Sequence, residues 1–167
     1  MNLGLPLRQP GQRLGAGIVR TVAYVPAGRF RRTDLERRDE HLSWERPDQA
    51  FFAAGACHIL AWPFIETYPD AGYGIVAARL ECDEHCFHAY VSNGTWAFDH
   101  AGWNLEADLL SATEEFEKKA VADRWTVLTD LKTYCRDYDH RPPEAYYADP
   151  RPRAQTYLAS FPAPHAR

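Results

Sequence analysis

Three residues of this sequence, Cys57, His88 and Asp99, are of the types that cooperate in nucleophilic catalysis. A thiolate is a strong nucleophile, an imidazole can take the proton of the thiol, and a carboxylate can hold the imidazole in one tautomer. Together they could cleave an amide or ester through a thioester intermediate. Whether they do so depends on the elements that position them.

Cys57 is expected to lie at the start of a helix. Gly55 and Ala56 allow a sharp turn before it, an apolar stretch follows, and Pro63 is expected to kink or end the helix. A thiol at a helix N-terminus next to a protonated histidine has its pKa lowered. The sequence therefore predicts a thiolate at Cys57.

His88 and Asp99 flank the strongest hairpin signal in the chain. The pair Asn93-Gly94 separates two runs of alternating residues, and a type I′ turn at this pair requires positive φ at both positions. With these two residues as the loop, His88 lies directly opposite Asp99 on the neighbouring strand. The hairpin thus predicts a histidine–carboxylate contact.

The order of these residues resembles the papain-like superfamily of cysteine hydrolases, including its small NlpC/P60-type and transglutaminase-like branches. The resemblance covers roughly residues 47 to 103 and implies Cys57 as nucleophile, His88 as general base and acid, and Asp99 as the residue that orients His88. It also implies a glutamine as oxyanion donor. Gln49 is the candidate, although its spacing of eight residues from the cysteine is longer than the usual gap. The backbone N–H of Cys57 is the other candidate donor.

The implied function is a thiol-dependent acyl-transfer hydrolase of the amidase, peptidase or deamidase type, acting on an amide- or peptide-containing substrate without a cofactor. Two alternatives stay open. One is a non-catalytic scaffold or interaction protein with a papain-like fold. The other is a zinc-binding module, because Cys82, His85 and Cys86 lie close together and thiolates with imidazoles suit zinc.

The composition excludes several other classes of protein. Of 167 residues, 46% are hydrophobic and 25% are charged, which excludes a disordered or collagen-like chain. A formal net charge of −4 gives no reason to expect nucleic acid or a membrane surface as partner. No secretion signal and no apolar run of about 20 residues is visible, so we expect a cytoplasmic protein with reduced cysteines.

The surrounding elements predict a single α+β domain over residues 1–167, with an antiparallel sheet packed on the helix that carries Cys57. The resemblance implies a papain-like core. Asn104 is expected to cap a helix over Leu105 to Phe116, and a further helix is expected from Asp123. Residues 1–17 are expected to form an irregular arm, and residues 139–167 an extended strap with a short last helix.

Overall fold

A five-stranded sheet, antiparallel at every strand pair, lies at the centre of the computed structural model, which describes residues 23–164. Its spatial order is β4-β3-β2-β1-β5. The strands are β1 (Gly74–Leu80), β2 (His88–Ser92), β3 (Trp96–Asp99), β4 (Gly102–Leu105) and β5 (Val121–Val127). The expected α+β class is confirmed.

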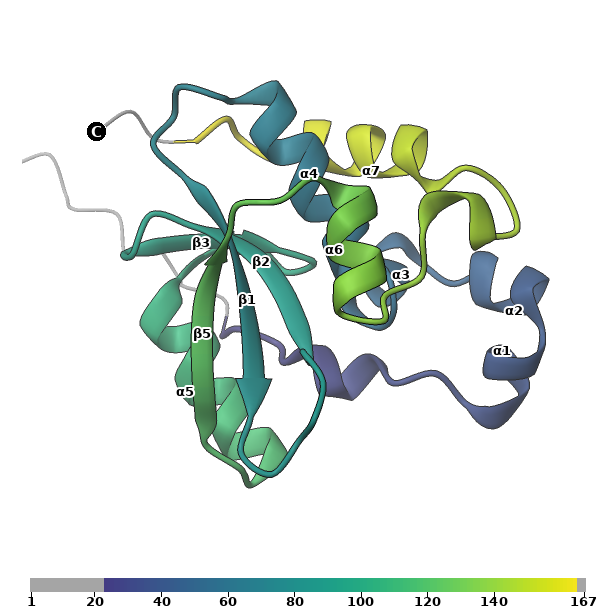
Figure 1. Ribbon diagram of the computed structural model, residues 1–167, viewed down its shortest axis with the longest axis horizontal. Helices are drawn as coiled ribbons and strands as arrows, with labels where there is room; N and C mark the ends of the chain where they lie inside the picture. The colour runs from purple at the N-terminus through teal and green to yellow at the C-terminus, as the bar shows by residue number, and fades with distance from the viewer. Residues whose placement is uncertain (1–22, 165–167) are drawn as a thin grey trace, which may run out of the picture.

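Seven α-helices and two short 3-10 helices surround the sheet within the described residues. The α-helices are α1 (Asp34–Arg38), α2 (Glu40–Trp44), α3 (Asp48–Ala53), α4 (Cys57–Thr67), α5 (Glu106–Glu117), α6 (Leu131–Asp137) and α7 (Pro150–Ala159). The 3-10 helices are η1 (Ala27–Phe30) and η2 (Pro143–Ala145). In Figure 1, α4 and α7 lie side by side, and α5 lies apart from them. None of the helices in residues 23–164 is long and apolar enough to cross a membrane.

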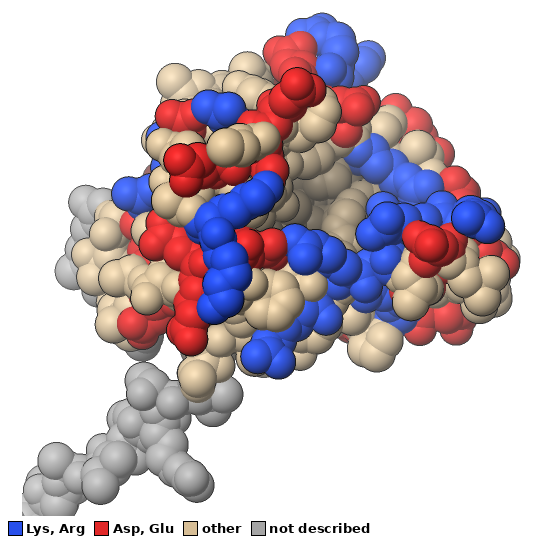
Figure 2. Space-filling model, turned by 90° about the horizontal axis from the view of Figure 1, so that it is seen from below, with Lys and Arg blue, Asp and Glu red and all other residues tan. Residues whose placement is uncertain are grey.

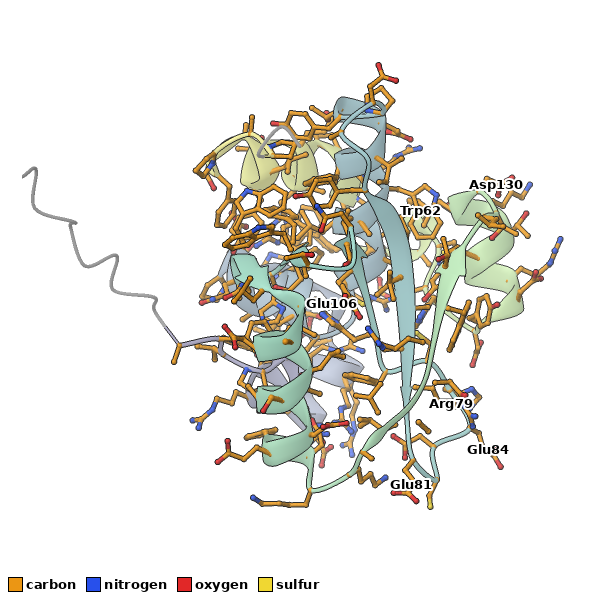
Figure 3. The ribbon with its side chains drawn as sticks, turned by 90° about the vertical axis from the view of Figure 1, so that its left-hand side faces the viewer. Trp62, Arg79, Glu81, Glu84, Glu106 and Asp130 are labelled. Atoms are coloured by element: carbon orange, nitrogen blue, oxygen red, sulfur yellow. The ribbon has the colours of Figure 1, made fainter. Side chains whose placement is uncertain are left out.

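The two faces of the sheet bury different side chains, because successive residues of a strand point to opposite faces. One face packs on α4 and α7 and contributes Ile75, Val91 and Phe98. The other face packs on α5 and contributes Ala78, Tyr90 and Ala97. On this second face, Glu106 at the start of α5 accepts hydrogen bonds from Tyr90 and Arg124 (Figure 3). Helix α4 and helix α5 are therefore separated by the sheet.

Helix α4 begins at Cys57, as expected. Gly55 has φ +110°, a backbone conformation that favours glycine, and provides the turn between α3 and α4. The helix continues through Pro63 to Thr67, so the proline does not end it. Cys57 is thereby placed in the first turn of a helix packed on β2.

The hairpin between β2 and β3 is present, but its turn differs from the predicted one. The Asn93 N–H bonds to the carbonyl of Trp96, so the two loop residues are Gly94 and Thr95. Gly94 has φ +88°, whereas Asn93 is not among the described residues with positive φ. Glycine at the first loop position is what a type II′ turn requires, and the type I′ prediction is wrong. The Asn93 side chain instead accepts hydrogen bonds from the N–H groups of Thr95 and Trp96.

This turn shifts the strand register by two residues. Ser92 pairs with Ala97, and not with Thr95 as the type I′ turn would require. A shift of two leaves every side chain on the face that the sequence predicted, because the side-chain period of a strand is two. His88 and Asp99 are therefore diagonal neighbours on one face, and not directly opposite each other.

Of the two further helices expected, one is present and one starts elsewhere. The helix expected after Asn104 is confirmed as α5, but it begins at Glu106 and Asn104 does not cap it, because Asn104 lies in β4, which pairs with β3 as far as Leu105. Asp123 lies within β5, which pairs with β1. The predicted arm, residues 1–17, lies outside the described residues. The predicted strap contains η2 and α7.

Candidate active site

His88 and Asp99 form a buried pair at the ends of two strands. His88 is the first residue of β2 and Asp99 the last of β3, and His88 Nε2 lies 2.9 Å from Asp99 Oδ2. Burial would raise the pKa of Asp99, but the rings of His100 and His88 outweigh it and hold that pKa well below its usual range. The carboxylate is therefore ionised and only accepts hydrogen bonds, so His88 Nε2 carries the proton.

The second ring nitrogen of His88 is Nδ1. It is buried and has no hydrogen-bond partner in the part of the chain that the structure describes. With the proton on Nε2, the Nδ1 of a neutral ring is an acceptor. Buried polar atoms usually have a partner, and a group reserved for catalysis is one reason for an exception. Nδ1 is thus the His88 atom available to take a proton.

The Cys57 sulfur lies beside the residue that follows His88. It accepts a hydrogen bond from the Ala89 N–H at 3.4 Å and belongs to the buried cluster on the α4 face of the sheet. His88, by strand alternation, lies on the α5 face with Asp99. Within residues 23–164, no hydrogen bond joins the sulfur to the His88 ring. Cys57 therefore lies at the start of β2, but its sulfur does not contact the His88 imidazole directly.

Cys57 is a neutral thiol in this environment. Only 8% of the residue is exposed, and burial, with a smaller contribution from Cys86, raises the pKa of its thiol to about 12. The N–H groups of Ala89 and His58 act in the opposite direction but do not compensate. The expectation of a lowered pKa is wrong, because desolvation outweighs the helix N-terminus.

Backbone N–H groups at the start of α4 could stabilise an oxyanion. The first hydrogen bond of the helix runs from the Leu60 N–H to the Ala56 carbonyl, which leaves the preceding N–H groups, that of Cys57 included, without a partner inside the helix. No side chain caps this end. Gln49 lies in α3, and none of the hydrogen bonds among the described residues connects it to Cys57. The backbone therefore suits this role better than Gln49.

Two residues that sequence reasoning missed surround Asp99. The Tyr24 hydroxyl donates to Asp99 Oδ2 at 2.7 Å, and His100 Nδ1 lies 3.2 Å from the same oxygen. Burial would lower the pKa of His100, but Asp99 raises it overall. Tyr24 is 75 residues from Asp99 and gives no local signal, whereas the position of His100 directly after Asp99 could have been noticed.

The described residues contain one group with potential metal-ligand spacing, and it is not the predicted one. His88, Asp99 and His100 place their ligand atoms within 4.8 Å of one another. Cys82, His85 and Cys86 form no such group: Cys82 is exposed, and Cys86 is buried against Tyr134 and the His88 carbonyl. The zinc alternative lacks the geometry it requires.

A second buried network adjoins Cys57 on the α4 side. The Tyr134 hydroxyl lies 3.2 Å from Cys86 Sγ and 3.1 Å from His140 Nε2. The His140 ring stacks on that of His58, with ring centres 4.8 Å apart. Burial lowers the pKa of His58 to about 3. This network places two neutral imidazoles, those of His58 and His140, on the α4 side of Cys57.

No protein-family model, curated protein or solved structure matches this chain. The interpretation of the site therefore depends on its own geometry and on the order of its residues in the chain.

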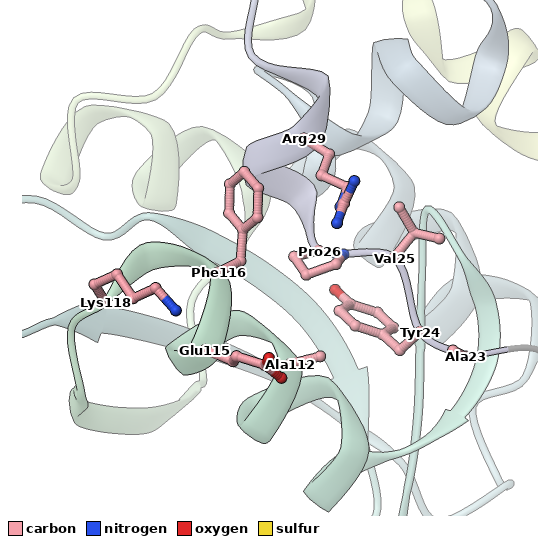
Figure 4. Close-up of a pocket in the computed structure, with 9 residues that line it drawn as sticks. All are labelled: Ala23, Tyr24, Val25, Pro26, Arg29, Ala112, Glu115, Phe116 and Lys118. Atoms are coloured by element: carbon pink, nitrogen blue, oxygen red, sulfur yellow. The ribbon is translucent and has the colours of Figure 1, made fainter.

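Two pockets lie near the site without being lined by Cys57, His88 or Asp99. One, of about 490 Å³, lies between the segment before η1 and α5, with Tyr24, Arg29 and Phe116 around it (Figure 4). The other, of about 520 Å³, is lined by residues of α6 and the segment after it, His140 among them. Each pocket thus contains a residue of one network beside the site, Tyr24 in the first and His140 in the second.

Proposed function

We propose that this protein is a thiol-dependent acyl-transfer hydrolase of the amidase, peptidase or deamidase type. Cys57 is the nucleophile, His88 the general base and acid, and Asp99 the residue that orients His88. The observation that carries the proposal is the His88 ring, in which Asp99 holds Nε2 while the buried Nδ1 has no partner. The same three residues support membership of the papain-like superfamily, which is part of this proposal.

In the proposed reaction, His88 Nδ1 takes the proton of the Cys57 thiol while the sulfur attacks the substrate carbonyl carbon. The carbonyl electron pair moves to oxygen, and N–H groups at the start of α4 stabilise the oxyanion. When this intermediate collapses, the C–N bond breaks and the leaving amine takes the proton from His88. Water then attacks the thioester with His88 as base, and release of the acid regenerates the thiol.

The raised pKa of the Cys57 thiol places the proton transfer after substrate binding. A thiol with a pKa of about 12 is protonated at neutral pH, so the thiolate forms only when His88 accepts the proton directly. Hydrogen bonds between catalytic groups are often long in ligand-free enzymes and shorten with substrate bound. In the free protein the sulfur and the imidazole lie on opposite faces of the sheet, so the proposed transfer also requires the start of β2 to move when substrate binds.

Labelling with a substrate-like electrophile tests the proposal. A peptidyl acyloxymethyl ketone carries a carbonyl that engages the catalytic groups, and mass spectrometry reads out each cysteine separately. We expect Cys57 to be labelled faster than the exposed Cys82, and His88→Ala to slow labelling of Cys57 by about 100-fold, as loss of a general base does. His85→Ala, at an exposed histidine nearby, is the control and should change nothing. Preferential labelling of Cys82 would contradict the proposal. So would a Cys57 labelling rate in His88→Ala equal to that in the native protein.

One observation favours the non-catalytic scaffold as a second candidate. Cys57 lies among buried residues, with Ala77, Ala89 and Tyr134, as a structural cysteine does. A scaffold does not need the thiol, so Cys57→Ala would fold normally and the electrophile would label Cys82 first. The same experiment therefore separates the two functions.

A further inference from the structure

Arg32 lies against the turn that leads to Cys57. It belongs to the segment between η1 and α1, and its guanidinium lies 3.4 Å from the position that a Cβ atom on Gly55 would occupy. Gly55 precedes Cys57 by two residues. A cation from a distant part of the chain is thus held beside the helix end that carries the candidate nucleophile.

Arg32 forms no ion pair among the described residues, unlike the arginines around it. The three arginines that act on its pKa each pair with a carboxylate: Arg37 with Asp34, Arg46 with Glu36, and Arg141 with Glu40. Among residues 23–164, the Arg32 guanidinium makes neither a hydrogen bond nor an ion pair. It is half-buried, and burial together with the neighbouring cations lowers its pKa. Arg32 lowers the pKa of Glu36, but that carboxylate pairs with Arg46. A partly buried charge without an ion-pair partner is unfavourable, and an anion bound there would reduce the penalty.

Tyr146 and Arg141 also lie beside the turn that Arg32 contacts. The Tyr146 hydroxyl donates to the Gly55 carbonyl at 2.6 Å, and the Arg141 guanidinium lies 5.0 Å from the centre of the Tyr146 ring. Seen from below, the molecule is hollowed near its centre, with Lys and Arg side chains gathered on the side of α1 and α2 (Figure 2).

We propose that Arg32 binds a carboxylate of the substrate, so that the hydrolase prefers amides with a negatively charged group beside the scissile bond. Arginine suits this role because its planar guanidinium can bind a carboxylate through two parallel hydrogen bonds. The proposal rests on the proposed function and adds the substrate class to it. Arg32 is a specificity-determining residue here and takes no part in bond cleavage.

The first test compares two alkylating reagents that differ in charge. Iodoacetate is an anion and iodoacetamide is its neutral isostere. We compare the ratio of their rate constants at Cys57 with the same ratio at Cys82 in the same molecules. The Cys57 ratio should exceed the Cys82 ratio by about fivefold, equivalent to an ion pair of about 1 kcal/mol. Arg32→Gln should remove this excess. A Cys57 ratio equal to that of Cys82 in the native protein would overturn the proposal.

The matched control is Arg29→Gln. Arg29 lies three residues earlier, over the Phe116 ring, and its substitution changes the net charge by the same amount. It should keep the excess for iodoacetate. If Arg29→Gln and Arg32→Gln lower the ratio equally, the effect comes from net charge and the Arg32 site is refuted.

A second test separates failure of Arg32 from failure of the hydrolase. Inorganic phosphate should raise the midpoint of thermal unfolding in the native protein and in Arg29→Gln, but not in Arg32→Gln, because ligands that bind the folded state stabilise it. If Cys57 reacts with neither reagent but stabilisation by phosphate still requires Arg32, the proposed hydrolase function is refuted and the anion site at Arg32 is supported. If phosphate raises the unfolding midpoint of Arg32→Gln as much as that of the native protein, the anion site at Arg32 is refuted.

Discussion

Asp99 connects three parts of the chain through its two carboxylate oxygens. Oδ2 accepts from Tyr24 and from His88, and Oδ1 accepts from the Ala101 N–H at 2.8 Å. A buried carboxylate needs several donors, because an uncompensated buried charge is strongly destabilising. These donors keep the carboxylate ionised, and the ionised carboxylate fixes the tautomer of His88.

At this scale we predict that Tyr24→Phe costs more stability than Tyr157→Phe. Both changes remove one hydroxyl, but Tyr24 donates to a carboxylate whereas Tyr157 donates to the backbone carbonyl of His100. Hydrogen bonds to charged groups contribute about 2 kcal/mol and neutral ones about 1 kcal/mol. Urea unfolding measures both losses. Equal losses would mean that the Tyr24 bond does not support an ionised Asp99.

Features of single residues that follow from the local sequence pattern were predictable, and those that depend on how deeply a residue is buried were not. The His88–Asp99 contact follows from strand alternation, and it survives the error in register because that error is an even number of residues. The pKa of Cys57 was predicted in the wrong direction because the sequence does not tell how far a helix end is buried. Tyr24 reaches Asp99 only through the fold of the whole chain.

At the scale of elements, two hairpin glycines have positive φ but different surroundings. Gly94, in the β2–β3 loop, has no atom within 4 Å of an added Cβ. Gly102, after the turn that follows Asp99, has φ +77° and lies under the Phe161 ring. The first position therefore requires glycine for its backbone conformation alone, and the second also for space.

We predict that Gly94→Ala destabilises the protein by about 1–2 kcal/mol, the cost of backbone strain at one residue. Gly102→Ala should cost about 1–3 kcal/mol more, because the ring must also move. Chemical denaturation of both variants checks the difference. Losses of equal size would show that Phe161 does not pack on Gly102 in solution.

The predicted element boundaries are wrong where strand pairing between distant segments overrides the local preference for helix. The stretch after Asp123 has helical spacing if Leu128 is counted on the inner face, yet Leu128 is 91% exposed. Pairing with β1, more than 40 residues away in sequence, makes this stretch a strand instead. The helix that carries Cys57 was predictable because its turn, apolar run and length all agree locally.

For the molecule as a whole, His58 links stability to pH. Burial lowers the pKa of its ring to about 3 in the folded protein, against 6.5 as its ordinary value. Between these values the unfolded chain binds a proton that the folded protein does not, so stability decreases as pH falls. His140, whose pKa burial also lowers, acts in the same direction. His100 acts oppositely: its contribution is present below pH 6.5 and is lost as pH rises through its raised pKa.

We predict that His58→Gln flattens the dependence of unfolding free energy on pH between 6 and 4 by about 1 kcal/mol per pH unit. Urea unfolding at several pH values, followed by circular dichroism, measures this slope. His85→Gln changes an exposed histidine and should leave the slope as it is in the native protein. An unchanged slope in His58→Gln would mean that this ring is protonated in the folded state.

The burial of the Cys57 sulfur also affects which cysteine is oxidised first in an oxidising environment. Peroxide attacks thiolates that it can reach, and forms sulfenic acid and then irreversible products. A protonated sulfur enclosed by a strand and a helix is a poor target, whereas Cys82 lies open at the surface. Oxidative damage should therefore accumulate first at Cys82, which takes no part in the proposed reaction.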